Sequence, residues 1–142
     1  MKRFGQAVGC RLRGGETIEL VGDVGAGKTT FTKGLALGMN ITEPIQSPTF
    51  TISRVYETPH ELRLAHYDFY RLREAGIMSD ELQEATSQPT TVTVVEWAKI
   101  VEGVLPKDRL RLEITPTSED SRTVVVAATG EKSKALLEGI SR

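Results

Sequence analysis

The segment from Gly22 to Thr29 constrains the fold of this chain more than any other stretch. It reads Gly-Asp-Val-Gly-Ala-Gly-Lys-Thr and fits the pattern G-x-x-x-x-G-K-[ST] at every fixed position. A β-rich run, Thr17 to Val21, precedes it, and a helical run, Thr29 to Met39, follows it. A strand, a glycine-rich loop and a helix in this order are typical of phosphate-binding α/β domains. The sequence therefore predicts an α/β fold that holds a phosphate group.

The residue types in this segment have physical reasons to lie beside phosphate. Glycines let backbone N–H groups point inward at phosphate oxygens, and the following helix adds the positive end of its dipole. Lys28 is placed to reach the β- and γ-phosphates, and the Thr29 hydroxyl is placed to ligate Mg²⁺. A purely structural turn would have no use for this Lys-Thr pair. The residues that we expect to bind nucleotide in this segment are Asp23, Val24, Gly25, Ala26, Gly27, Lys28, Thr29 and Thr30.

The identity of the base is predicted from a motif that the chain lacks. Small GTPases read guanine with an Asn-Lys-x-Asp motif, which does not occur here, since Asn40 is followed by Ile41. This favours ATP over GTP.

Two carboxylates come directly after β-rich runs. Asp68 follows the run Leu62 to Tyr67, and Glu96 follows the run Thr91 to Val95. If these strands are parallel neighbours of the strand before the glycine loop, all three features share the carboxyl edge of one sheet, where ligands bind. Both acids are then candidates to hold Mg²⁺ and orient water. Taken alone, each is equally well explained as a strand-end acid in a solvated turn.

Thr49 and Trp97 can each be interpreted as structural or as functional residues. Thr49 lies in the loop Ser47-Pro48-Thr49-Phe50, and a threonine in a comparable loop of GTPases senses the γ-phosphate. On the residues alone, a Ser-Pro turn before a strand is favoured. Trp97 is the only tryptophan. On the residues alone, we favour a role as an anchor in the core or at its rim.

The remaining pattern predicts a mixed sheet flanked by helices, in a single domain over residues 1–142. A helix is expected over Phe4 to Leu12, ended by Gly14-Gly15, and a hairpin over Thr49 to Tyr56 and Leu62 to Tyr67. The other expected elements are a partly helical stretch, Phe69 to Thr86; a short helix, Trp97 to Val101; strands Leu110 to Thr115 and Arg122 to Ala128; and a last helix, Glu131 to Ile140.

Composition excludes several functional classes. With 18 Lys and Arg against 19 Asp and Glu, the net charge of -1 argues against DNA or RNA binding through bulk positive charge. The only cysteine, Cys10, cannot form an internal disulfide and has no metal-ligand spacing with either histidine. No apolar run approaches the length of a membrane span, and none follows the basic start as in a signal peptide. We expect a cytoplasmic protein without a membrane partner.

Four motifs together resemble the TsaE family, also called YjeE, over roughly Phe4 to Leu112. They are the glycine loop with its helix start, Gly22 to Phe31; Ser-Pro-Thr-Phe, Ser47 to Phe50; His-Tyr-Asp-Phe-Tyr-Arg, His66 to Arg71; and Glu96-Trp97. Their order and spacing agree with the family. This combination is far more specific than the glycine loop alone.

The resemblance implies a small P-loop ATPase that uses ATP and Mg²⁺. It implies that Thr29 and Glu96 contact Mg²⁺, that Asp68 takes the Walker-B-like place and Thr49 the switch-like place, and that Trp97 lies near the nucleotide. The catalytic residues would thus be Glu96, Asp68 and Thr49. The family supports threonylcarbamoyladenosine formation on tRNA, beside the anticodon, by acting on TsaD paired with TsaB, so tRNA is met indirectly. Two alternatives remain: a small-molecule kinase, and a nucleotide-gated binding module without turnover.

Overall fold

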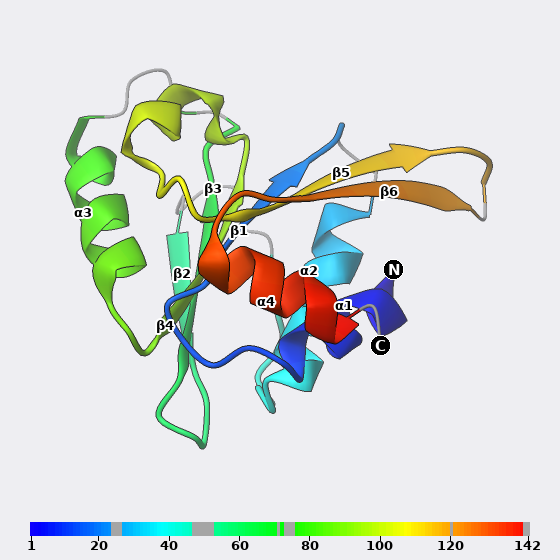
Figure 1. Ribbon diagram of the computed structural model, residues 1–142, viewed down its shortest axis with the longest axis horizontal. Coiled ribbons are helices and arrows are strands. Elements are labelled where there is room, and N and C mark those ends of the chain that lie inside the picture. Colours follow the sequence, from blue (N-terminus) through cyan, green and yellow to red (C-terminus); the bar gives the residue numbers. More distant parts are fainter. Residues whose placement is uncertain (24–26, 47–52, 71, 73–75, 120, 141–142) are drawn as a thin grey trace.

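The computed structural model describes residues 1–23, 27–46, 53–70, 72, 76–119 and 121–140. Helices and strands are mixed along the chain, as expected (Figure 1). In order, the elements are α1 (Lys2–Gly9), β1 (Thr17–Val21), α2 (Lys28–Gly38), β2 (Ser53–Glu57), β3 (Arg63–Asp68), α3 (Gly76–Ser87), β4 (Thr91–Glu96), the 3₁₀ helix η1 (Ala98–Val104), β5 (Leu110–Pro116), β6 (Arg122–Ala128) and α4 (Glu131–Ile140).

The strands form one six-stranded mixed sheet in the order β2-β3-β4-β1-β5-β6. The four central strands, β3, β4, β1 and β5, are parallel to one another, while β2 and β6 run antiparallel at the two edges. Strands β1, β4 and β3 are therefore parallel neighbours, as the position of the two strand-end acids required. The α/β class with a mixed sheet flanked by helices is confirmed.

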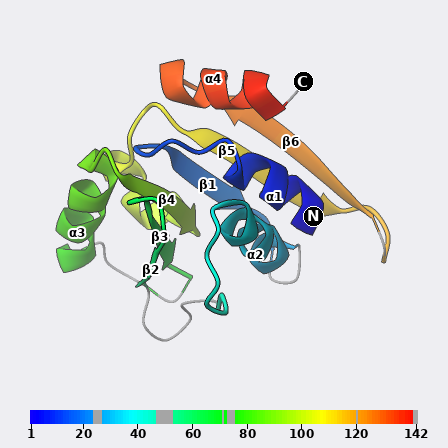
Figure 2. The ribbon, with the colours of Figure 1, turned by 90° about the horizontal axis from the view of Figure 1, so that it is seen from below.

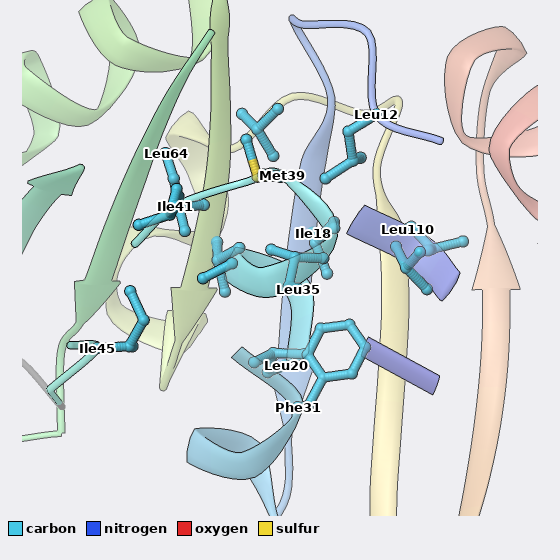
Figure 3. Packing of buried hydrophobic residues seen from close by; sticks show 14 of the residues in the cluster. Leu12, Ile18, Leu20, Phe31, Leu35, Met39, Ile41, Ile45, Leu64 and Leu110 are labelled. Atoms are coloured by element: carbon cyan, nitrogen blue, oxygen red, sulfur yellow. The ribbon is translucent and has the colours of Figure 1, made fainter. Parts of the chain in front are cut away.

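Helices cover both faces of this sheet (Figure 2). On one face, α1 and α2 pack with Leu136 of α4 against the central strands. Figure 3 shows Phe31 and Leu35 of α2 lying over Ile18 and Leu20 of β1. On the other face, α3 and η1 pack on a second cluster that contains Ala65 and Tyr67 of β3 and Val95 of β4.

Helix α1 packs unusually close to α2 because glycines line both sides of the contact. A Cβ atom added at Gly9 would overlap the carbonyl oxygen of Leu35, and one added at Gly34 would overlap that of Lys2. Gly5 and Gly38 occupy equivalent tight positions. Since α2 begins at Lys28, this contact holds the helix that follows the glycine loop.

Several expected boundaries were wrong. Helix α1 ends at Gly9 and not at Leu12, so Gly14-Gly15 does not end it. The Glu16 carboxylate instead accepts hydrogen bonds from the backbone N–H groups of Arg13 and Gly14, at 2.8 and 2.7 Å, which fixes a separate turn.

Other differences affect the site directly. Asp68 and Glu96 are the last residues of β3 and β4, and do not follow them. The short helix starts after Trp97 and is of the 3₁₀ type, and α3 begins only at Gly76. Among the described residues, no helix combines the length and apolar character needed to cross a membrane.

Candidate functional site

Among the described residues, Asp68, Glu96 and Lys28 lie together at one edge of the sheet. Asp68 and Glu96 are register partners on β3 and β4, and Leu20 of β1 is the register partner of Glu96 on its other side. Strand β1 then leads into Gly22 and the glycine loop. Because the three strands are parallel, their carboxyl ends meet where open α/β sheets bind ligands.

Lys28 lies at the start of α2 with only 5% of its surface exposed. Its ammonium Nζ donates to the carbonyl oxygen of Gly22 at 2.6 Å and lies 3.8 Å from Oε1 of Glu96. It also lies 4.2 Å from the centroid of the Trp97 ring. Burial lowers the pKa of Lys28, although the charges of Glu96, Asp68 and Asp23 oppose that shift. A buried ammonium therefore has three neighbours, which are the Gly22 carbonyl oxygen, the Glu96 carboxylate and the Trp97 ring.

Glu96 divides its carboxylate between two neighbours. While Oε1 faces Lys28, Oε2 lies 2.6 Å from Nε2 of His66. Glu96 is 3% exposed and His66 is fully buried. The sequence predicted Glu96 but gave His66 no role at this site. A histidine inside an apolar strand resembles a core residue, and only its place two residues before Asp68 hinted at the same face.

Asp68 ends β3 beside Glu96 and is 9% exposed. Burial raises the pKa of its carboxyl group, and the charge of Glu96 raises it further. The backbone N–H of Tyr70, which donates to Oδ1 at 3.0 Å, and the charge of Lys28 act in the opposite direction. Two neighbouring carboxylates and one ammonium thus share a small buried volume, which is typical of functional sites.

The Trp97 ring borders Lys28, and the Tyr70 ring lies against Trp97. The backbone of Trp97 has a left-handed conformation, with φ of 55°, directly after Glu96. Its ring lies 4.8 Å from that of Tyr70, centroid to centroid, and Tyr70 is 53% exposed. Trp97 also packs against the second core cluster. It therefore serves as the rim anchor that its residue type suggested, and its ring contacts Lys28.

The first turn of α2 presents its backbone N–H groups at the end of the glycine loop. Gly27 precedes it with φ of 112°, a conformation that favours glycine, and no side chain among the described residues caps this end of the helix. Uncapped N–H groups and the helix dipole make such an end suitable for an anion. A Cβ atom added at Gly27 would lie 3.8 Å from Nε of Arg122, a neighbour that no motif had indicated.

Comparison with known proteins identifies the family. The sequence pattern of "Threonylcarbamoyl adenosine biosynthesis protein TsaE" matches residues 1–124. The chain belongs to the TsaE family. It is 40% identical over 128 residues to the tRNA threonylcarbamoyladenosine biosynthesis protein TsaE of Bacillus subtilis, covering 90% of this chain and 79% of that one. The TsaE protein of Streptomyces coelicolor is 36% identical, with 93% of each chain covered.

A solved structure agrees with this assignment. The chain superimposes on the crystal structure of Bacillus subtilis YdiB with a TM-score of 0.81 and 36% identity, covering 99% of this chain and 86% of that one. Membership of the TsaE family connects the chain to the biosynthesis of threonylcarbamoyladenosine in tRNA.

For the other residues that the TsaE motifs mark, the structure gives only their position and exposure. Thr29 and Thr30 lie in the first turn of α2, the former half-buried and the latter exposed, and Asp23 is exposed after β1. Val24, Gly25, Ala26 and Thr49 lie outside the described residues.

The described residues contain no group of three or more His, Cys, Asp or Glu side chains suited to hold a metal ion. Mg²⁺ at phosphate-transfer sites commonly uses only one or two protein oxygens, with phosphate and water oxygens as its other ligands. The Thr29 hydroxyl and the Glu96 carboxylate are oxygen donors of the kind that this ion prefers.

Proposed function

We propose that this chain binds ATP with Mg²⁺ and hydrolyses it as a TsaE subunit that supports threonylcarbamoyladenosine modification of tRNA. The observation that carries this proposal is the position of Lys28. Its buried ammonium lies at the start of α2, facing the strand-end carboxylate of Glu96 with Asp68 beside it. A positive charge at an uncapped helix start, next to two acids, suits a phosphate chain and its metal.

The residues of the site divide into three roles. Lys28 and the first backbone N–H groups of α2 bind the phosphates, while Thr29 and Glu96 would hold Mg²⁺. When bound, Mg²⁺ neutralises the charge that develops on the phosphate oxygens. Asp68, held at the end of β3, orients water and the Mg²⁺ site. Trp97 and Tyr70 border the same space.

We further propose that TsaD paired with TsaB accelerates ATP hydrolysis by this chain. The chain would contact tRNA only indirectly, through that complex. Charge stabilisation on the transferred phosphoryl group is usually the largest single catalytic contribution. In related P-loop enzymes a partner can supply a cation that stabilises this charge. We therefore expect the isolated chain to hydrolyse ATP slowly and the TsaD-TsaB pair to accelerate this hydrolysis. We propose that the protein acts in the cytoplasm.

The test compares Lys28→Ala with the wild type by calorimetric titration of ATP in the presence of Mg²⁺. We expect a large loss of affinity, because backbone N–H groups cannot replace the contacts of Lys28 with the β- and γ-phosphates. Lys33→Ala is the matched control, since Lys33 lies on the same helix with an exposed side chain. It should bind ATP like the wild type.

Phosphate release, measured with and without TsaD and TsaB, completes the test. Unchanged ATP affinity in Lys28→Ala would refute the phosphate-loop assignment. If the chain binds ATP but does not hydrolyse it under any condition, it would be a nucleotide-gated binding module. Phosphate transfer to any of a panel of small metabolites would instead indicate a kinase. Fast hydrolysis by the isolated chain would refute the dependence on partners.

A further inference from the structure

We infer that His66 is a positioning residue for Glu96. It holds one carboxylate oxygen so that the other faces Lys28. This inference rests on the proposed ATPase function, because it assigns His66 a part in preparing the Mg²⁺ site. His66 acts through Glu96, to which its Nε2 is hydrogen-bonded.

The geometry of two adjacent strands creates this contact. His66 is the register partner of Val94, and Asp68 is the register partner of Glu96, so the imidazole reaches diagonally from β3 to β4. The distance from Nε2 to Oε2 is 2.6 Å, and both side chains are almost completely shielded from water. A short hydrogen bond between two residues fixed on a sheet leaves Glu96 little freedom to turn.

The surroundings of His66 show that packing alone does not require a histidine there. Leu64 and Val94 belong to the apolar cluster on this face of the sheet, where a leucine would pack well at position 66. Nδ1 of His66 is buried and has no hydrogen-bond partner among the described residues. Burial of a polar ring is unfavourable unless its hydrogen bonds compensate. The polar contact that the described residues provide for this ring is the one with Glu96.

Loss of His66 should change how Glu96 meets Lys28. With Oε2 released, the carboxylate can turn both oxygens toward the ammonium and shorten a contact that is now 3.8 Å. The carboxylate would then be misplaced for Mg²⁺, while Lys28 would keep its place at the start of α2. Hydrogen-bonding partners of metal-ligating carboxylates typically contribute about 10- to 100-fold to metal affinity or activity.

The experiment compares His66→Leu with His66→Gln, whose amide N–H can take the place of Nε2–H. Each variant is titrated with ATP in EDTA and in Mg²⁺, using the fluorescence of Trp97, the only tryptophan and a neighbour of Lys28. Hydrolysis is measured with TsaD and TsaB present. Thr93→Val is the matched control, because Thr93 is equally buried on β4 and its hydroxyl has no partner among the described residues.

For His66→Leu we expect hydrolysis to fall about 10- to 100-fold, and the gain in ATP affinity caused by Mg²⁺ to shrink, while affinity in EDTA changes less than about threefold. His66→Gln should recover most of both losses, and Thr93→Val should behave like the wild type. Thermal unfolding establishes that each variant is folded.

Two results would overturn the inference. One is wild-type hydrolysis and a wild-type Mg²⁺ effect in His66→Leu. The other is an equal loss in His66→Leu and His66→Gln that accompanies lower melting temperatures and weaker binding in EDTA, which would show a purely structural role. Failure of the proposed function is distinguishable, because the wild type and Thr93→Val would then also lack ATP binding. If the wild type binds but does not hydrolyse ATP, the Mg²⁺ titration still decides the role of His66.

Discussion

The close contact between α1 and α2 predicts a specific effect of Gly34→Ala. A Cβ atom at Gly34 would overlap the carbonyl oxygen of Lys2 and lie 2.8 and 3.0 Å from its carbonyl carbon and Cα. All three are backbone atoms, so no flexible side chain can move aside. The two helices would have to separate, and with them the start of α2 that bears Lys28.

Two effects of opposite sign determine the size of the change. Alanine in the interior of a helix is favoured over glycine by about 1 kcal/mol. Overpacking of a well-packed contact costs about 1–3 kcal/mol, and rigid backbone places this case near the upper end. We therefore expect a net loss of about 1–2 kcal/mol in the free energy of unfolding. For a chain of this size the melting temperature should fall by about 3–7 °C.

Thermal unfolding followed by circular dichroism measures this loss, and ATP titration shows whether displacement of α2 also weakens binding. Gly103→Ala is the control, since a Cβ atom at Gly103 in η1 would meet nothing within 4 Å. It should change the free energy of unfolding by less than about 0.5 kcal/mol. A melting temperature of Gly34→Ala equal to or above that of Gly103→Ala would refute the argument from backbone overlap.

Three further outcomes follow from the site. Glu96→Gln should slow hydrolysis about 100-fold or more. ATP affinity should change far less, because in the proposed site Lys28 and backbone N–H groups would carry the phosphate contacts. Wild-type turnover of this variant with TsaD and TsaB would contradict this. Asp68→Asn should raise the melting temperature at pH 7, because a raised pKa means that the ionised carboxylate opposes folding. This gain should vanish in calorimetry as the pH falls below 3.8, the ordinary pKa, where both states are protonated. ATP should displace GTP in competition titrations, and preferential GTP binding would exclude the predicted base preference.

The parts of the fold that sequence predicted well are those with strong local patterns. The strand, glycine loop and helix were expected from a motif whose spacing reflects phosphate geometry, and the described parts of that segment agree. The limits of β6 and α4 agree with the expected 122–128 and 131–140, since polar turns and Gly130 bound them. The meeting of Asp68 and Glu96 was expected only on condition that their strands were parallel neighbours, which the register confirms.

Features that depend on contacts between distant segments were not predicted. The hydrogen bond between His66 and Glu96 depends on how β3 and β4 are registered, which no local pattern determines. The left-handed conformation of Trp97, which turns its ring onto Lys28, is uncommon for a large residue and had no sequence signal. The spacing of apolar residues predicts that helix α1 continues to Leu12. Leu12 is indeed buried, but it lies in a turn that follows the end of the helix at Gly9.

The electrostatics of the site connect ligand binding to stability. Burial lowers the pKa of Lys28 and raises that of Asp68, so the charged forms of both groups are disfavoured in the folded chain without a ligand. Lys28 is then stabilised by Glu96, the carbonyl oxygen of Gly22 and the Trp97 ring. A phosphate group beside Lys28 would favour its charged form more strongly and release Glu96 toward a metal ion. Binding of a phosphate ligand should therefore stabilise the fold in two ways. It should act by mass action, and it should compensate the buried charge of Lys28, which is otherwise unfavourable in the folded chain.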